Sequence, residues 1–129
     1  MNTIHSYKDL IIWQKGIGLV TAVYDFTKDF PKEETFGLTS QIKRAAVSIP
    51  TNIAEGRFRG SRKDFNNFLR IAYASGAELE TELYISENLK FGNIEKLKKV
   101  RAILDEEMRM LNVMIKKLSI ETKKLTANS

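Results

Sequence analysis

The sequence predicts an all-α protein folded as an up-down-up-down antiparallel four-helix bundle. Apolar residues recur at spacings of three and four in four separate segments, which is the periodicity of amphipathic helices. No segment alternates with a period of two for long enough to indicate a strand. With only two prolines and seven glycines in 129 residues, long helices joined by short connections are expected, and these make antiparallel neighbours.

The first helix is expected to start near Ser6, with Ser6 as its N-cap and Asp9 in a capping-box position, and to stop at Pro31. It carries two apolar stripes, one made of Leu10, Trp13, Ile17, Val20 and Tyr24, the other of Ile12, Gly16, Leu19, Val23, Phe26 and Phe30. A helix on the outside of a small bundle needs only one apolar face. The second face favours contact with another subunit, and we expect Ile12, Leu19, Val23 and Phe26 at that oligomer interface. The alternative is a central helix wrapped by its own chain.

A second helix is outlined by Leu38, Ile42, Ala45, Ile49 and Ile53. Pro50 lies inside this pattern, and because proline removes a backbone donor we expect a kink there, with the hydroxyls of Ser48 and Thr51 bonding the freed backbone groups. Gly56 is expected to end the helix, and Gly60 to lie in the connection that follows.

The third helix is predicted to run from an N-cap at Ser61, with Asp64 in the capping-box position, to about Lys90. Its inner stripe contains Phe65, Phe68, Leu69, Ala72, Gly76, Leu79 and Leu83. Asn93 is the expected N-cap of the fourth helix, whose inner face contains Leu97, Val100, Leu104, Met108, Leu111, Ile115 and Leu118. We expect a single domain over residues 1–129, with a core over about 7–118 and a frayed polar tail over 119–129.

Composition argues against most catalytic chemistry. The chain has no cysteine and one histidine, His5, so a thiolate site, a ferritin-like di-metal centre and zinc catalysis are not expected. There is no Walker loop, no GxGxxG after a strand and no GxSxG. Glu78, Glu80 and Glu82 offer paired carboxylates, but pairing with basic residues such as Lys43 or Arg44 is the favoured interpretation. We expect no enzyme, no metal and no cofactor.

The first residues lack a cationic start followed by an apolar run, and no apolar run reaches the roughly 18 residues of a membrane span. We therefore expect a cytoplasmic protein with no membrane partner and no small-molecule substrate.

The net charge of the chain, +5, is contained in residues 41–70, which hold seven basic and two acidic side chains. We take the candidate nucleic-acid-binding residues from this window: Lys43, Arg44, Arg57, Phe58, Arg59, Arg62, Lys63 and Arg70. Arginines offer bidentate donors to phosphates, and an exposed aromatic side chain can stack on an unpaired base. The alternative is that Phe58 packs into the end of the bundle while the arginines are solvated or pair with acids of a neighbouring subunit.

Two blocks of sequence resemble a known bacterial family. They are YKDLIIWQKGIGLV near the N-terminus and IKRAAVSIPTNIAEG followed by GRFRGSRKDF in the middle. Together they look like the four-helix-bundle proteins encoded in intervening sequences of 23S rRNA genes, some of them labelled S23 ribosomal proteins. The resemblance implies a four-helix fold and commonly a ring-shaped homopentamer. It also implies a relationship to the accessory protein of diversity-generating retroelements, a basic pentameric barrel that works with nucleic acid.

The residues and the resemblance together predict a non-enzymatic homo-oligomeric bundle that binds RNA, other nucleic acid or a ribonucleoprotein through its basic surface. The alternative function is a protein–protein scaffold or adaptor that binds no nucleic acid.

Overall fold

The structure is a computed structural model that describes residues 6–127, with side chains to residue 124. Within this range the chain forms four α-helices: α1 (Ile11–Thr27), α2 (Leu38–Arg59), α3 (Arg62–Asn88) and α4 (Ile94–Ala127). Two short 3₁₀ turns, η2 (Tyr7–Asp9) and η3 (Lys32–Glu34), precede α1 and α2. His5 and residues 128–129 of the expected tail lie outside the described residues.

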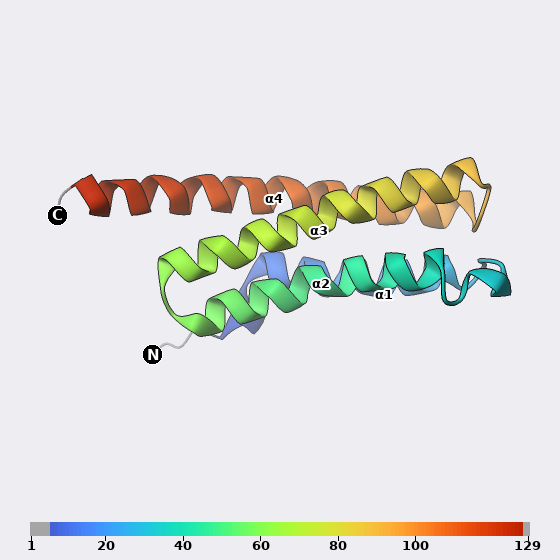
Figure 1. The fold of residues 1–129 in the computed structure, drawn as a ribbon, viewed down its shortest axis with the longest axis horizontal. Helices are drawn as coiled ribbons and strands as arrows, with labels where there is room; N and C mark the ends of the chain where they lie inside the picture. Colours follow the sequence, from blue (N-terminus) through green and yellow to red (C-terminus); the bar gives the residue numbers. More distant parts are fainter. Residues whose placement is uncertain (1–5, 128–129) are drawn as a thin grey trace.

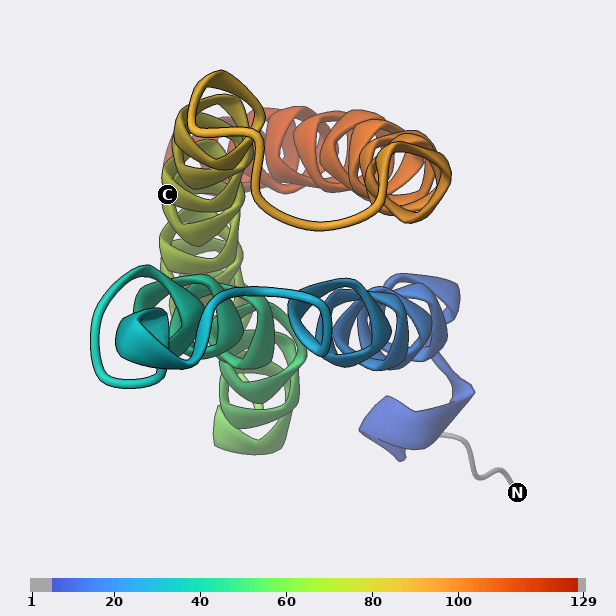
Figure 2. The ribbon, with the colours of Figure 1, turned by 90° about the vertical axis from the view of Figure 1, so that its right-hand side faces the viewer.

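The helices run alternately in opposite directions and pack as a bundle (Figure 1). Both α1 and α3 pack against α2 and α4, so the four helices surround a common core (Figure 2). One end of the bundle holds the α2–α3 connection, the start of α1 and the last part of α4; we call it the turn end. The other holds residues 28–37 and 89–93, and we call it the linker end. The predicted all-α four-helix bundle is confirmed.

The core takes one face from each helix. Val23, Ile49, Leu79 and Leu111, from the four helices in order, are each 0% exposed. Burying a side chain of this size contributes about 1.5–3 kcal/mol. The periodic positions predicted from the sequence therefore supply most of the stabilising apolar surface.

The start of α1 differs from the prediction. Ser6 does act as a cap, but its Oγ accepts from the backbone N–H of Lys8 and so caps η2, whereas α1 begins at Ile11. The reason is the backbone of Leu10, which is extended (φ −76°, ψ 129°) and separates the two elements. The helix ends at Thr27, before Pro31 is reached.

Helix α2 is continuous through Pro50, and the kink expected there stays a prediction. The hydroxyl of Thr51 donates to the carbonyl of Val47, while Ser48 bonds Ser75 of α3 at 2.8 Å. The expectation that Gly56 ends the helix is wrong. Gly56 lies inside α2 because α3 approaches it closely there: a Cβ at this position would lie 2.6 Å from Cβ of Phe68.

Two caps predicted for α3 and α4 are confirmed. Ser61 Oγ accepts from the N–H of Asp64 at 3.0 Å, and Asn93 Oδ1 accepts from the N–H of Lys96 at 3.0 Å. Helix α3 ends at Asn88, two residues before the expected end. Helix α4 continues past Leu118, the last core residue, to Ala127, so residues 119–127 of the predicted frayed tail are helical.

None of the helices within residues 6–127 combines the length and apolar character that crossing a membrane requires.

Candidate nucleic-acid interface

Five of the predicted binding residues flank the turn between α2 and α3 at the turn end. Arg57, Phe58 and Arg59 form the last turn of α2, and Arg62 and Lys63 open α3. The chain reverses between them at Gly60, whose φ of +90° is the left-handed conformation that glycine adopts without strain, and Ser61 caps the next helix. A tight helix-to-helix turn thus concentrates the cations.

Two arginines of this turn are held over aromatic rings of α3. The Arg57 guanidinium lies 5.9 Å from the centre of the Phe65 ring, and that of Arg59 lies 5.0 Å from the Phe68 ring. Arg59 also pairs with Glu55 at 3.0 Å. Contacts of this kind orient the guanidinium groups and leave N–H donors free for a ligand.

Phe58 has no packing role in this chain, since its side chain is 85% exposed. The alternative in which it packs into the end of its own bundle is therefore wrong. An aromatic ring in water among four cations is available to stack on an unpaired base.

The last part of α4 adds cations to the turn end. Arg62 pairs with Glu121 at 3.6 Å, and both Arg70 and Asn66 donate to Ser119 Oγ at 3.0 Å, so α4 is fastened along the start of α3. Lys116, Lys117, Lys123 and Lys124 are exposed on this segment. In the part of the chain that the structure describes, these lysines form no ion pair.

Lys43 and Arg44 do not join this cluster. They lie near the start of α2, and Lys43 is sixteen positions before Arg59, which is about 24 Å along a helix with a rise of 1.5 Å per residue. Lys43 instead places its ammonium 4.6 Å from the centre of the Tyr24 ring. The basic window of the sequence is therefore divided between two regions, because α2 is too long to keep both of its ends near one site.

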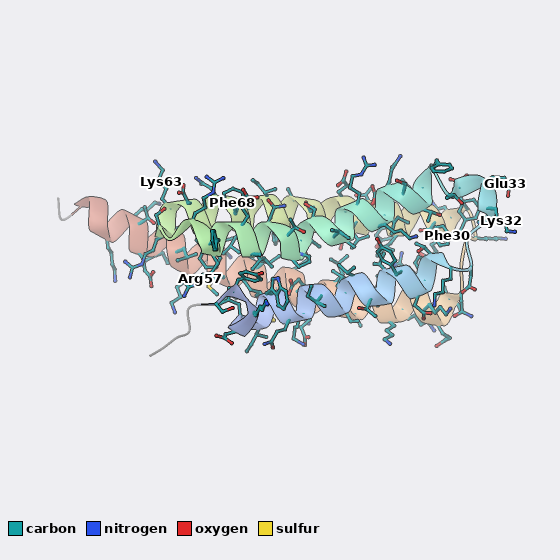
Figure 3. All side chains as sticks on the ribbon, turned by 90° about the horizontal axis from the view of Figure 1, so that it is seen from below. Phe30, Lys32, Glu33, Arg57, Lys63 and Phe68 are labelled. Carbon is teal, nitrogen blue, oxygen red and sulfur yellow. The ribbon has the colours of Figure 1, made fainter. Side chains whose placement is uncertain are left out.

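The two ends of the bundle differ in charge. In residues 6–10, 55–70 and 116–124 of the turn end, ten side chains are basic and four acidic; the basic ones are Lys8, Arg57, Arg59, Arg62, Lys63, Arg70, Lys116, Lys117, Lys123 and Lys124. In residues 25–37 and 87–99 of the linker end, six are basic and six acidic. Figure 3 labels Arg57, Lys63 and Phe68 at the first end and Phe30, Lys32 and Glu33 at the second.

A shallow groove opens beside Arg57 at the turn end. Its volume is about 260 Å³, and it is lined by residues from α2, α3, α4 and the segment before α1. Its apolar lining residues, which we call the floor, are Leu10, Phe65, Met114 and Leu118, and its charged lining residues, which we call the rim, are Arg57, Arg62, Lys117 and Glu121. The side-chain types are those of a binding groove, because apolar contact and charge are offered together.

The family of the chain follows from a comparison that covers most of its length. The family model described as "23S rRNA-intervening sequence protein" matches residues 8–113. The chain belongs to this family. Among solved structures it is similar to a protein of unknown function from the S23 ribosomal protein family of Bacteroides thetaiotaomicron, with 26% identity, a TM-score of 0.75, and 82% of this chain and 99% of that chain covered. No curated protein matches the chain.

In this member of the 23S rRNA-intervening sequence family, the residues expected at an oligomer interface are internal. Ile12 is 3% exposed, and Leu19, Val23 and Phe26 are 0% exposed, because α2 and α4 of the same chain cover them. These four side chains are therefore not a surface that a neighbour can reach in this fold. The other stripe of α1 is accessible: Ile17 is 42% and Tyr24 43% exposed.

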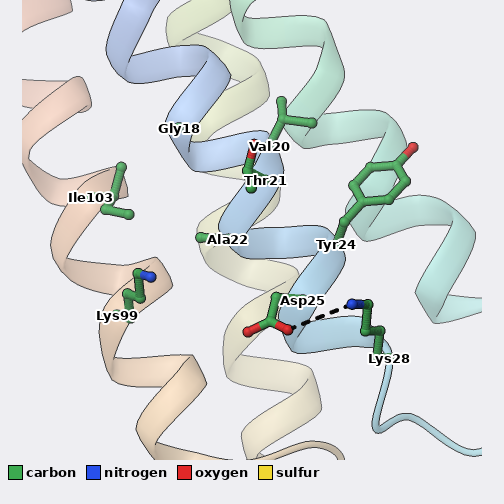
Figure 4. Close-up of a pocket in the computed structure, with 9 residues that line it drawn as sticks. All are labelled: Gly18, Val20, Thr21, Ala22, Tyr24, Asp25, Lys28, Lys99 and Ile103. Atoms are coloured by element: carbon green, nitrogen blue, oxygen red, sulfur yellow. Dashed lines mark ion pairs between the residues drawn. The ribbon is translucent and has the colours of Figure 1, made fainter.

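The accessible stripe borders an open groove between α1 and α4 of about 810 Å³ (Figure 4). Val20, Ala22 and Tyr24 of α1 line it, with Lys99 and Ile103 across from them on α4. Asp25 and Lys28 form an ion pair at its edge, drawn dashed in Figure 4. The second apolar face noticed in the sequence is therefore real, but it is the opposite stripe that stays uncovered in a single chain.

The family member also buries two carboxylates that sequence reasoning did not place. Glu82 is 5% exposed and Glu107 is 0% exposed, and Oε1 of Glu82 and both oxygens of Glu107 have no hydrogen-bond partner among the described residues. Burial raises the pKa of Glu82 to about 7, with Glu78 adding to the rise. Burial also raises the pKa of Glu107 to about 8, opposed by nearby Lys15 and assisted by Glu106.

A signal for Glu107 was present in the sequence. It lies three residues after Leu104 and four before Leu111, a position of the inner stripe that was assigned to its neighbour Met108. Gly16 makes room for it, since a Cβ there would lie 3.1 Å from Glu107 Oε2 and 3.2 Å from Pro50 Cβ.

Glu78 and Glu80 are exposed, and none of the three AELETEL carboxylates pairs with Lys43 or Arg44 in the described structure. No group of three His, Cys, Asp or Glu side chains within the described residues is arranged to hold a metal ion.

Proposed function

We propose that this protein is a non-enzymatic homo-oligomeric bundle that binds RNA or another nucleic acid through its turn end. The observation that carries the proposal is the charge of the turn end, where ten side chains are basic and four acidic, whereas the opposite, linker end is neutral. Basic side chains that neutralise phosphates release the counterions bound there, and this release supplies most of the non-specific affinity of a protein for nucleic acid. The relationship that the family resemblance implies to the retroelement accessory protein, which works with nucleic acid, supports the same choice.

Assembly strengthens the proposal. The uncovered stripe of α1 around Ile17 and Tyr24 is the surface on which we place the subunit contact, and the family resemblance suggests five subunits. A ring of identical chains would present the turn end several times about one axis. Weak phosphate contacts at single chains then act together, which raises the overall affinity without any new contact.

A salt titration of RNA binding tests the function. The test variant changes Arg57, Arg59, Arg62 and Lys63 to Glu, and the matched control changes Lys32, Lys90, Lys98 and Lys99 of the linker end to Glu, so both alter the net charge equally. We expect the test variant to lose affinity by about a hundredfold or more at low salt, and the control to lose far less. Equal losses, or no measurable binding of the unchanged protein at low salt, would contradict the proposal.

The assembly is tested separately. Ile17→Glu combined with Tyr24→Glu should reduce the mass found by light scattering while the helical circular dichroism is kept. Val23→Glu should instead unfold the chain, because it introduces a charge into the core. A monomeric unchanged protein at micromolar concentration would contradict the oligomer.

The second candidate function is a protein–protein scaffold, and the uncovered apolar stripe of α1 is the observation that favours it. In that case the charges at the turn end serve assembly. The fourfold reversal at Arg57, Arg59, Arg62 and Lys63 would then break the oligomer, and the unchanged protein would bind no RNA.

A further inference from the structure

The groove beside Arg57 has the size of a site for one ring system. Its volume of about 260 Å³ lies below the roughly 300–1,000 Å³ of sites that enclose a drug-sized ligand. It is partly open to water, and Gly60 and Ser61 also line it. A ligand that places one flat group inside and continues outside fits these dimensions.

The lining of the groove offers apolar and planar groups on which the flat face of a nucleobase can stack. The floor is apolar, and its Phe65 is 7% exposed and lies under the Arg57 guanidinium, 5.9 Å from it. Proteins recognise unpaired bases by stacking them on aromatic side chains and on guanidinium planes. Arg57 is the element of the groove that offers such a plane next to an apolar floor.

The rim of the groove matches the groups next to a base. Three of the four charged rim residues are cations. Lys117 can receive a flanking phosphate, and Arg62 can do so with the N–H groups that its 3.6 Å contact with Glu121 leaves free. The fourth, Glu121, is a carboxylate that only accepts hydrogen bonds when ionised. Guanine presents adjacent N–H donors on N1 and N2 to two such oxygens, whereas the other bases lack this pair.

We propose that this groove binds one unpaired base, with guanine preferred, of a single-stranded or looped RNA. The inference rests on the proposed function, and it adds the form of the nucleic acid and the residue that reads it. Arg57 stacks on the base, Arg62 and Lys117 hold the neighbouring phosphates, and Glu121 accepts from the Watson–Crick edge. A duplex is excluded from the groove because its base faces and edges are already occupied.

The first experiment compares two conservative variants, R57K and R59K, by fluorescence anisotropy. The probes are a twelve-nucleotide oligouridylate with one central guanosine and an RNA duplex of the same length. Both variants keep the charge and both replace an arginine that lies over a phenylalanine, but only Arg57 lines the groove. R57K should bind the single strand about tenfold more weakly, with the duplex affinity unchanged, and R59K should lose no more than about twofold.

The second experiment tests the role of Glu121 by comparing the affinities for two probes. Inosine lacks the N2 amino group of guanine, so the unchanged protein should bind the guanosine probe about fivefold more tightly than the same strand with inosine. E121Q should bring this ratio close to one. Because both strands carry the same phosphates, any general effect of E121Q on charge or on Arg62 cancels.

The outcomes separate the two proposals. If no RNA binds at low salt, the proposed function fails and the base site fails with it. If single strand and duplex bind alike, and R57K and R59K behave alike, the proposed function stands and the base site is wrong. If R57K weakens the single strand alone but the ratio for guanosine over inosine is one in the unchanged protein, the assignment of guanine to Glu121 is wrong.

Discussion

At the linker end of the bundle the charges are compensated, whereas at the turn end they are not. Lys96 bridges Asp25 at 3.4 Å and Asp29 at 2.9 Å, and Arg101 pairs with Glu87 at 2.8 Å. The Asp29 carboxylate raises the pKa of Lys96, and Arg101 lowers that of Glu87, as expected for groups that hold one another ionised. At the turn end, by contrast, Glu55 and Glu121 each pair with one arginine and the cations remain in excess.

The two ends also differ in packing. The linker end is closed by aromatic side chains: the Phe26 and Phe30 rings lie 5.0 Å apart and those of Phe30 and Phe91 lie 5.6 Å apart. At the turn end Phe58 is 85% exposed and the groove is open. An exposed ring is common to both ends, since Phe36 of the linker end is 96% exposed. The ends therefore differ in the aromatic packing beneath the surface, in their excess charge and in the groove.

Two glycines with positive φ give the largest expected contrast. Gly92, at the linker end, has φ +79°, and a Cβ there would lie 2.6 Å from Phe26 Cε1. Gly60, at the turn end, has φ +90°, and a Cβ there would have no atom of the described residues within 4 Å. Gly92→Ala should lower the free energy of unfolding by about 2–4 kcal/mol, and Gly60→Ala by about 1 kcal/mol. Urea denaturation measures both. Equal losses would show that the aromatic closure of the linker end contributes little.

The middle of the bundle should give stability a pH dependence that neither end explains. A carboxyl whose pKa is raised from 4.5 to about 8 on folding keeps its proton in the fold while the unfolded chain releases it. Glu107 should therefore make stability fall as pH rises from about 4.5 to 8, by up to ~1.4 kcal/mol per pH unit, and then level off. Because Glu82 adds its own slope below pH 7, urea denaturation should show about half the slope in Glu107→Gln below that pH and almost none between pH 7 and 8.

Glu82 refines that measurement. Since its pKa is raised only to about 7, Glu82→Gln should remove about half of the slope between pH 4.5 and 7, where both carboxyls contribute, and leave the slope between pH 7 and 8 unchanged. A slope that survives the double variant E82Q/E107Q would mean that neither carboxyl is its source.

The α4 lysines test how far the proposed binding surface extends. Changing Lys116, Lys117, Lys123 and Lys124 to Gln should reduce the slope of log affinity against log salt by about 0.7 for each lysine that contacts a single-stranded phosphate. The matched variant changes Lys32, Lys90, Lys98 and Lys99 of the linker end to Gln and should keep the slope. An unchanged slope in the first variant would confine the surface to the α2–α3 turn.

The smallest expected effects compare one helix cap from each end. Ser61→Ala and Asn93→Ala each leave a backbone donor of the first helical turn without its side-chain acceptor. Each should cost about 1 kcal/mol of unfolding free energy, because both caps are exposed to water. Thermal denaturation measures them, and a much larger loss for Ser61→Ala would indicate that the turn end depends on its cap for more than helix initiation.

Local chemistry made several features predictable. Proline, glycine and capping side chains act within a few residues, so the caps at Ser61 and Asn93 were found correctly. The end of α2 was not, because Gly56 serves a close approach to Phe68 of the next helix and not a termination. The same limit explains why Glu107 was not predicted to be buried. Periodicity locates the inner stripe of a helix only to within about one residue, and the neighbouring Gly16 and Pro50 decide which side chain points inward.

The sequence by itself determined the helical class of this protein, the inner face of α2, α3 and α4, the family and the location of its excess charge. Each of these depends on residue type and on spacing along one chain. The tertiary structure decided which stripe of α1 is covered, that Lys43 and Arg44 lie apart from the arginines at the turn, and that the last part of α4 brings further lysines to them. These are contacts between segments far apart in the chain, and they depend on helix length and packing direction, which no local pattern records.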